Sequence, residues 1–179
     1  VLRGFAEMPK WPRFNDVWGV NALAIAMYPM YRGVSKVVGM TVMPPAASME
    51  EEITMLEQNW DKYDFFFVHI KKTDSYGEDG NFEGKVHIIE EVDQLLPRIL
   101  ALNPDTLIIT GDHSTPAKLK SHSWHPVPTL LYAKDCRPDG IASFGERACV
   151  AGSLGPRFDA TDLMPFALGH AGRLVKYGA

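Results

Sequence analysis

Two short segments concentrate the acidic and imidazole side chains that bind metal ions in proteins. The first, DSYGE, places Asp74 and Glu78 one helical turn apart in sequence, and the second, GDHSTP, contains the adjacent pair Asp112 and His113. His122 follows at the start of HSWHPVP. Carboxylate oxygens and imidazole nitrogens are the ligand set of Zn, Mn and similar divalent ions. Five such side chains exceed the needs of one tetrahedral ion, so the pattern favours two.

A pair of ions implies a particular chemistry. Two divalent cations ~3.5–4 Å apart can hold both the attacking and the leaving oxygen of a phosphoryl displacement. The alternative is structural, because an Asp-His pair after a strand is often a helix cap or a surface turn. His125, which precedes Pro126 in the same segment, is either a substrate contact or a surface residue. The residue types alone leave these alternatives open.

The candidate ligands follow apolar stretches that predict buried strands at 64–70, 106–110 and 127–133. A polar loop is expected at 71–84, and a helix from Lys85 to Ala101 that kinks or ends early at Pro97. This alternation predicts an α/β fold with a mostly parallel sheet flanked by helices. Ligands bind at the carboxyl ends of such strands. If 64–70 and 106–110 are neighbours, ~4.8 Å apart, the five side chains converge.

The rest of the chain adds further elements. Residues 19–39 predict two helical pieces that meet at Tyr28–Met30, because Pro29 interrupts the pattern. Ser48 and Glu51 form a capping box for the next helix. Asp162 is expected to cap a helix that begins at Leu163. The opening VLRGF is consistent with the end of a strand.

Composition excludes some classes of function. The chain has 179 residues, 46% hydrophobic residues and a formal charge of −4, so it can bury a core and has no basic block for nucleic acid. No apolar run approaches the ~20 residues of a membrane span. Its two cysteines, outside any CxxC pair, indicate a reduced, cytoplasmic protein. The start lacks a methionine and a targeting pattern, which suggests processing or a fragment.

Several segments together resemble a known family, the archaeal-type 2,3-bisphosphoglycerate-independent phosphoglycerate mutases of the alkaline phosphatase superfamily. They are GDHSTP, HSWHPVP, HIKKTDSYGEDG, YPMYRGVSKVVGM and the tail DLMPFALGHAGRLVKYGA. The likeness extends over nearly the whole chain. It implies an alkaline-phosphatase-like fold, here as a partial domain.

The resemblance implies a function as well. Members of the family interconvert 3-phosphoglycerate and 2-phosphoglycerate in glycolysis, and two divalent metals activate a Ser or Thr that carries the phosphoryl group as a phosphoenzyme. By this likeness Asp74, Glu78 and His122 hold one metal, and Asp112 and His113 belong to the other. Mn is favoured, with Zn, Mg and Co as alternatives. Arg32 and His125 are the candidate substrate-binding residues, since a guanidinium fork suits the carboxylate or phosphate of a small phosphorylated substrate.

The chain departs from the family pattern in two places. Glu78 stands where many relatives carry a histidine, and this extra negative charge favours harder cations such as Mn or Mg. Nothing in 1–179 matches the N-terminal segment that supplies an aspartate ligand and the nucleophile, or the inserted substrate domain. Residues 1–179 are therefore expected to be the C-terminal part of the phosphatase-like metal-binding domain. Such a piece has no catalytic residue of its own, is inactive in isolation and can self-associate; Ser114 is a loop-supporting residue rather than the nucleophile.

Two other functions remain open. The same metal cradle serves other metal-dependent phosphatases and phosphomutases of the superfamily, whose substrates are set by the missing domain. Alternatively, Glu78 and the unmatched N-terminal segment are also compatible with a non-catalytic metal-binding module that has kept the fold and lost the reaction.

Overall fold

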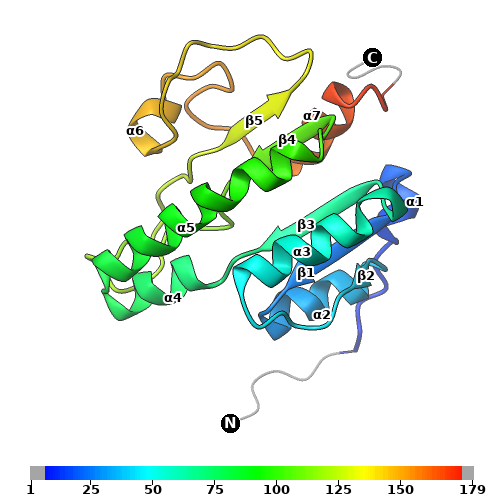
Figure 1. The fold of residues 1–179 in the computed structure, drawn as a ribbon, viewed down its shortest axis with the longest axis horizontal. Coiled ribbons are helices and arrows are strands. Elements are labelled where there is room, and N and C mark those ends of the chain that lie inside the picture. The colour runs from blue at the N-terminus through cyan, green and yellow to red at the C-terminus, as the bar shows by residue number, and fades with distance from the viewer. Residues whose placement is uncertain (1–6, 175–179) are drawn as a thin grey trace. The chain divides into compact units, whose positions relative to one another are not determined.

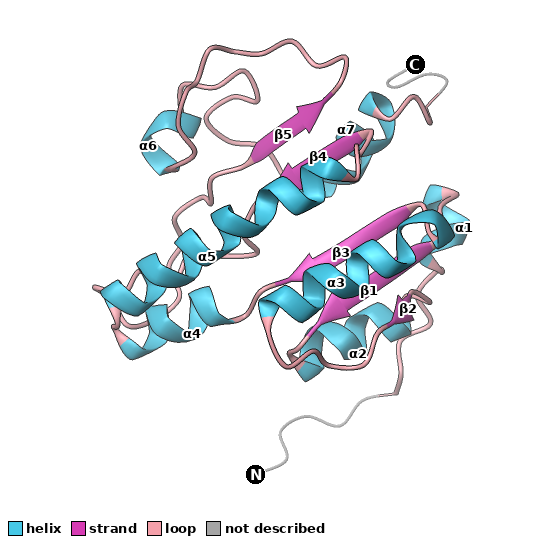
Figure 2. Ribbon diagram, in the orientation of Figure 1, coloured by secondary structure: helices cyan, strands magenta, loops and turns pink. Residues whose placement is uncertain are grey.

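A computed structural model of the chain describes residues 7–174. The chain divides into two compact units, one ending at Lys71 and the other beginning at Lys72, and each is described by itself (Figure 1). Figure 2 shows that both units combine helices with strands. The α/β class expected from the sequence is therefore confirmed.

The first unit is built on a parallel three-stranded sheet. Its central strand β1 (Ala22–Ala26) pairs with β2 (Thr41–Val42) on one side and with β3 (Phe65–His69) on the other. Every residue of β1 is buried. A continuous apolar stretch is what a parallel strand covered on both faces requires. The strand predicted at 64–70 is thus confirmed as β3.

Helices connect these parallel strands. α1 (Phe14–Trp18) precedes β1, α2 (Pro29–Val37) joins β1 to β2, and α3 (Met49–Asn59) with the short 3₁₀ turn η1 (Trp60–Lys62) leads to β3. The capping box at the start of α3 is confirmed in part, because Ser48 caps the helix but Glu51 bonds the residue before the cap. The Ser48 hydroxyl accepts a hydrogen bond from the Glu51 amide at 3.2 Å, and the Glu51 carboxylate accepts one from the Ala47 amide.

The helix predicted across 19–39 is wrong in its first half. Residues 22–26 form the buried strand β1. Alanine favours helices when local propensity alone decides. The ALAIA run, however, is short and all five of its side chains are apolar. As a strand between β2 and β3 it is buried on both faces. Pro29 does not interrupt a helix; it occupies the first turn of α2, where a missing backbone N–H costs nothing.

The second unit begins with two helices and contains an antiparallel strand pair. Its elements, in chain order, are α4 (Lys72–Asp79), α5 (Phe82–Ala101), β4 (Thr106–Ile109), β5 (Leu130–Ala133), α6 (Glu146–Cys149), the 3₁₀ turn η2 (Ala160–Asp162) and α7 (Leu163–His170). β4 and β5 pair antiparallel. α7 packs against β4, and the Thr106 hydroxyl donates a hydrogen bond to the Ala167 carbonyl at 3.2 Å.

The loop predicted at 71–84 is also wrong, because most of it is helix α4. α5 begins at Phe82, where the Asn81 side chain accepts a hydrogen bond from the Gly84 amide. Pro97 does not end this helix, which continues to Ala101. Proline has no backbone N–H, so the carbonyl of Asp93 lacks its usual helical partner at Pro97. Both residues are exposed, so water can replace the missing hydrogen bond.

The remaining strand and helix predictions have mixed outcomes. The strand predicted at 106–110 is confirmed as β4, and that at 127–133 is confirmed in part as the shorter β5, which runs antiparallel rather than parallel. α7 begins at Leu163 as predicted, but no hydrogen bond from the Asp162 side chain caps it in the described structure. The strand end expected within VLRGF lies outside the described residues.

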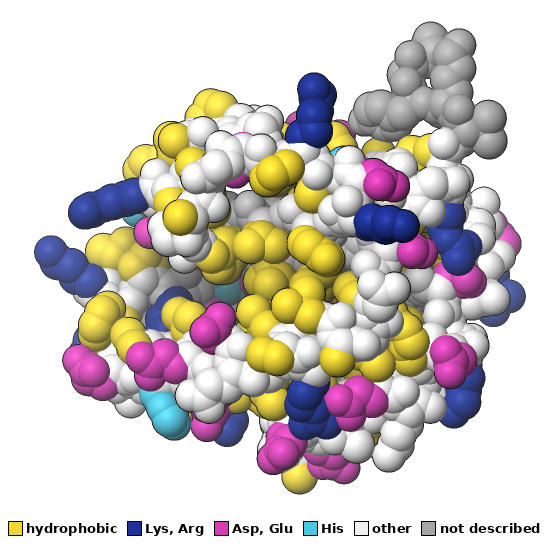
Figure 3. Space-filling view, turned by 45° about the horizontal axis from the view of Figure 1, so that its top comes forward, with side chains coloured by type: hydrophobic (Ala, Val, Ile, Leu, Met, Phe, Trp, Pro, Cys, Tyr) yellow, Lys and Arg dark blue, Asp and Glu magenta, His cyan; other side chains and the backbone are white. Residues whose placement is uncertain are grey.

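Apolar side chains reach the surface of the molecule (Figure 3). In the second unit a shallow apolar hollow of about 320 Å³ is lined mainly by α5 and the strand pair, through Leu96, Leu100, Leu107, Ile109, Leu130 and Tyr132. Self-association of the chain stays a prediction.

Within residues 7–174 no helix is both long enough and apolar enough to cross a membrane. Cys136 and Cys149 are free thiols.

Candidate metal centre

All five predicted metal ligands lie in the second unit. Asp74 and Glu78 are on α4, one turn apart and therefore on the same face of the helix. Asp112, His113 and His122 lie in the segment between β4 and β5. The sequence predicted that they would meet because β3 and β4 are neighbours, but these strands belong to different sheets. Asp74 and Glu78 come from a helix and not from the predicted loop.

A backbone bridge brings the two histidines together. Ser114 and Ser123 form an isolated antiparallel bridge, in which the Ser123 amide donates to the Ser114 carbonyl at 2.9 Å. Side chains alternate across such a bridge, so His113 and His122 project to the side opposite the two serines. Their ring centroids are 3.9 Å apart. Ser114 therefore supports this segment, through its main chain.

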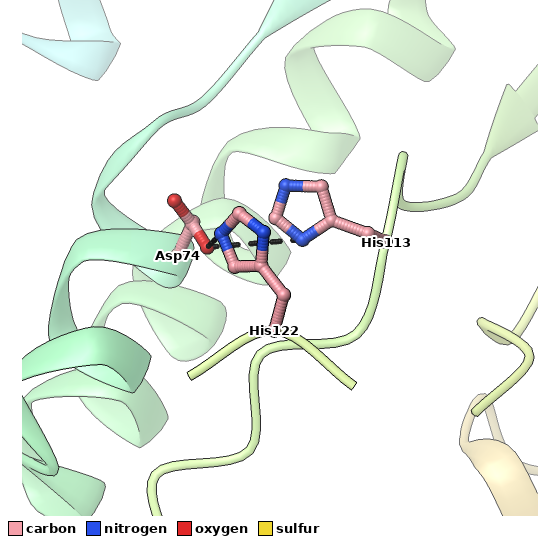
Figure 4. A group of neighbouring side chains, drawn as sticks. All are labelled: Asp74, His113 and His122. Carbon is pink, nitrogen blue, oxygen red and sulfur yellow. Dashed lines mark ion pairs between the residues drawn. The ribbon is translucent and has the colours of Figure 1, made fainter. Parts of the chain in front are cut away.

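His122 faces both carboxylates of α4. Its Nε2 atom lies 3.4 Å from Asp74 Oδ1 and 3.5 Å from Glu78 Oε1 (Figure 4 shows the contact with Asp74). Two donor atoms that each lie ~2.1 Å from one tetrahedral ion are ~3.4 Å apart. His122 thus lies at the separation of shared ligands from each of the two carboxylates, and the three side chains have the donor types that a divalent ion needs.

His113 faces a different carboxylate with its Nε2 atom, which lies 3.5 Å from Asp112 Oδ2. The other Asp112 oxygen accepts a hydrogen bond from the His113 amide at 3.0 Å and so fixes the carboxylate. His113 Nδ1 lies 3.8 Å from Asp74 Oδ1. Asp74, His113 and His122 can also be grouped as one candidate site, with ligand atoms within 4.8 Å of one another. The arrangement therefore admits either one three-residue site or two smaller sites.

The cluster has a buried side and an open side. The Asp74 side chain is 13% exposed, whereas that of His122 is 54% exposed. Glu78 and Asp112 are also substantially open to solvent. An ion held here would keep coordination positions facing water or a ligand, as catalytic sites do.

Close packing against α4 holds the inner side of the cluster. Gly77 is buried, and a Cβ atom at this position would lie 2.2 Å from the Thr115 carbonyl oxygen. The absence of a side chain at Gly77 lets the segment with His113 approach the helix that carries Asp74. Lys85 on α5 donates a hydrogen bond from Nζ to the same Thr115 carbonyl at 2.7 Å. Burial lowers the pKa of the Lys85 ammonium, and the charges of Asp74 and Glu146 partly oppose this.

The two predicted substrate-binding residues belong to different units. Arg32 is on α2 in the first unit, and its Nε atom is buried with no hydrogen-bond partner among the described residues. His125 is exposed in the second unit, where its Nδ1 lies 2.9 Å from the Ser123 hydroxyl and its ring stacks on Trp124 at 4.4 Å. Substrate binding by Arg32 and His125 stays a prediction.

Thr115 and Lys85 were not among the predicted site residues. The signal for Thr115 was present in GDHSTP, because a residue two positions after His113 lies on the same side of an extended segment. No comparable signal pointed to Lys85, whose contact with Thr115 spans 30 positions of sequence.

Comparison with known proteins agrees with this donor set. A family model described as the Metalloenzyme superfamily matches residues 2–170. The chain therefore belongs to the metalloenzyme superfamily. This membership agrees with the likeness seen in the sequence and implies bound metal ions.

Curated relatives match over the full length of the chain. A protein from Thermosipho africanus is 55% identical over 179 residues, and one from Thermus thermophilus is 52% identical over 182 residues. Both are named "probable 2,3-bisphosphoglycerate-independent phosphoglycerate mutase". The match covers all of this chain but only 44% and 45% of these relatives, so the chain spans less than half of their length.

Solved structures share the fold. A protein structure from Pyrococcus horikoshii superposes with a TM-score of 0.88 at 31% identity and covers 94% of this chain and 54% of that protein. The cofactor-independent phosphoglycerate mutase from Thermoplasma acidophilum gives a TM-score of 0.74 at 22% identity, covering 92% of this chain and 40% of that one. The second likeness supports the fold alone.

Proposed function

We propose that this chain is the two-metal part of a 2,3-bisphosphoglycerate-independent phosphoglycerate mutase, an isomerase of phosphoglycerate in glycolysis. Asp74, Glu78 and His122 would hold one divalent cation, and Asp112 with His113 would contribute to the second. Mn is the favoured metal. The full activity would belong to a longer protein, in which residues 1–179 form the C-terminal part of the phosphatase-like domain.

One observation carries the proposal: two imidazole Nε2 atoms face separate carboxylates at 3.4–3.5 Å. These are separations typical of ligands that share an ion. Surface ion pairs of this length are common, but five of the chain's metal-binding side chains converge here from α4 and from the segment between β4 and β5. Isolated surface ion pairs do not need five such side chains in one place, so the convergence favours a metal centre.

Each part of the cluster has a defined task in this function. When bound, paired divalent ions neutralise the charge of a transferring phosphoryl group and lower the pKa of an attacking hydroxyl. The residues of this chain fix where those charges lie, and the exposed side of His122, Glu78 and Asp112 leaves room for a phosphorylated substrate. We expect the isolated chain to bind metal without mutase turnover, because it offers no matched nucleophile.

Replacing His122 tests the first cation site. We expect His122→Ala to weaken Mn²⁺ binding at one site by at least about tenfold, because the nitrogen donor that joins Asp74 and Glu78 is lost. Isothermal titration calorimetry of the 1–179 chain measures this. His87→Ala is the matched control, since His87 is exposed on α5 and pairs only with Glu91 among the described contacts. Equal Mn²⁺ affinity in wild type and His122→Ala would contradict the proposal.

Glu78 is expected to set the metal preference of the same site. Glu78→His removes one negative charge and supplies a nitrogen donor, which softer Zn²⁺ accepts better than Mn²⁺ does. The ratio of Zn²⁺ to Mn²⁺ affinity should rise by about tenfold, because the lost charge affects both divalent ions alike and only the change of donor discriminates between them. Competition titrations measure this ratio. Glu83→His, at the exposed start of α5, should leave it unchanged, and an unchanged ratio in Glu78→His would exclude Glu78 as a ligand.

A non-catalytic metal-binding module is the second candidate, and Glu78 is the observation that favours it. The two functions differ in the longer protein. Mutase activity with 3-phosphoglycerate in the protein that contains this chain supports the first. Metal binding without turnover of phosphoglycerate or of a simple phosphate monoester supports the second.

A further inference from the structure

Thr115 joins the two halves of the candidate metal centre. Its hydroxyl oxygen lies 3.0 Å from His113 Nδ1, and its hydroxyl hydrogen is donated to Asp74 Oδ1. The residue is only 3% exposed. Neither the family likeness nor the donor set gave this residue a role.

Hydrogen counting decides how these contacts are made. An ionised carboxylate only accepts hydrogen bonds, and a threonine hydroxyl has a single hydrogen. Since that hydrogen is donated to Asp74, the Thr115 oxygen has only lone pairs to offer to His113. A lone pair is favourable only toward a nitrogen that carries a proton, so the 3.0 Å contact with Thr115 favours the proton of the neutral His113 ring on Nδ1. The competing approach of Nε2 to the Asp112 carboxylate is longer, at 3.5 Å.

We propose that Thr115 is a positioning residue that holds His113 as its Nδ1–H tautomer and thereby directs the Nε2 lone pair toward Asp112. This inference rests on the metal-binding function proposed above and specifies how the cluster is divided. A protonated Nδ1 cannot ligate an ion, so His113 cannot share a cation with Asp74 through that atom. The alternative of one three-residue site is disfavoured, which leaves the two-site arrangement.

The surroundings of Thr115 fix its hydroxyl. Lys85 Nζ donates a hydrogen bond to the Thr115 carbonyl at 2.7 Å. The Thr115 side chain packs so closely against Gly77 that a Cβ atom there would lie 2.9 Å from the Thr115 methyl carbon. A β-branched side chain also has few χ1 rotamers available. The partner of a metal-binding histidine's second nitrogen commonly sets its tautomer and orientation in this way. Here the partner is a hydroxyl that in turn bonds a ligand of the other proposed site.

The tautomer can be measured without metal. Long-range ¹H–¹⁵N correlation spectra of the 1–179 chain distinguish a neutral ring protonated on Nδ1 from one protonated on Nε2. The His113 signals are assigned by their loss in His113→Gln. We expect the Nδ1–H form in wild type and in Thr115→Ser, which keeps the hydroxyl. Thr115→Val keeps the shape and loses the hydroxyl, and its His113 should populate the Nε2–H form.

Mn²⁺ titration of the same three proteins gives the second readout. Thr115→Val should bind at the His113 site about 10–100-fold more weakly than wild type, the usual effect of losing such a partner, whereas Thr115→Ser should recover most of the loss. A wild-type His113 in the Nε2–H form overturns the inference, even if Thr115→Val does not fold. So does a Thr115→Val protein with wild-type tautomer and affinity.

The two proposals fail in different ways. If wild type binds no Mn²⁺ while Thr115 still controls the His113 tautomer, the positioning role stands and the proposed metal function is wrong. If wild type binds two Mn²⁺ ions and His113 has the Nε2–H form, the metal function stands and the role of Thr115 is overturned.

Discussion

Gly77→Ala is expected to unfold or strongly weaken the second unit and to abolish tight Mn²⁺ binding. The added methyl group would lie 2.2 Å from the Thr115 carbonyl oxygen and 2.9 Å from its methyl carbon. Overpacking of a buried contact costs about 1–3 kcal/mol and sometimes more, and here the obstacle is backbone, which cannot rotate away. Because Thr115 contacts both Asp74 and His113, any shift that relieves the clash also separates the proposed ligands.

Gly33→Ala is the matched control for this prediction. Gly33 is also in a helix, α2, but a Cβ atom there meets nothing within 4 Å. Alanine in place of a helical glycine stabilises by roughly 0.5–1 kcal/mol. Urea unfolding and Mn²⁺ titration of both variants measure the effects. A Gly77→Ala protein with wild-type stability and affinity would mean that α4 and the Thr115 segment do not pack closely.

The second large effect concerns Glu52, which is expected to make the chain less stable as the pH rises. Glu52 on α3 is 0% exposed, and neither carboxylate oxygen has a hydrogen-bond partner among the described residues. Burial raises the pKa of this carboxyl from 4.5 to about 7. The folded chain therefore keeps a proton that the unfolded chain releases above pH 4.5. Stability from this group is fully present below pH 4.5 and is lost as the pH rises through about 7.

The size of this effect follows from the shift. A difference of 2.5 pH units between 4.5 and about 7, at about 1.36 kcal/mol per unit, gives a total loss of about 3 kcal/mol. Glu52→Gln cannot ionise, so it should be more stable than wild type at pH 8 and should lose most of this advantage at pH 4.5. Urea unfolding at the two pH values measures the difference. Glu50→Gln, exposed on the same helix, controls for the change of net charge; a constant difference between Glu52→Gln and wild type would contradict the expectation.

The sequence predicted the candidate ligands but not the route by which they meet. The sequence predicts a loop at Asp74 and Glu78 because DSYGE is polar and contains glycine. The same glycine, Gly77, is what allows α4 to pack against Thr115. Composition cannot distinguish a glycine that frees a loop from a glycine that admits a close contact in a helix. Only the tertiary partner decides this.

The strands show a similar division. β3 and β4 were predictable because each is a short, continuously apolar run that follows a helix. β1 was missed because its alanines favour a helix locally, and its burial between β2 and β3 depends on residues far along the chain. The antiparallel direction of β5 depends on how the segment that carries the histidines folds back, which no periodicity records.

The contact of Thr115 with Asp74 spans 41 positions of sequence. A threonine in a turn is usually read as a local backbone partner, so its reach to α4 could not be predicted. The residue types therefore predict which atoms could bind metal, whereas the packing of α4 and α5 determines which nitrogen of each histidine is available.

A Mn²⁺-soaked crystal of the 1–179 chain, measured at the Mn absorption edge, tests the two-site account most directly. The account predicts two anomalous peaks ~3.5–4 Å apart, one among Asp74, Glu78 and His122 and the other beside Asp112 and His113 Nε2. A single peak bound by Asp74, His122 and His113 Nδ1, or no peak at this cluster, would contradict it.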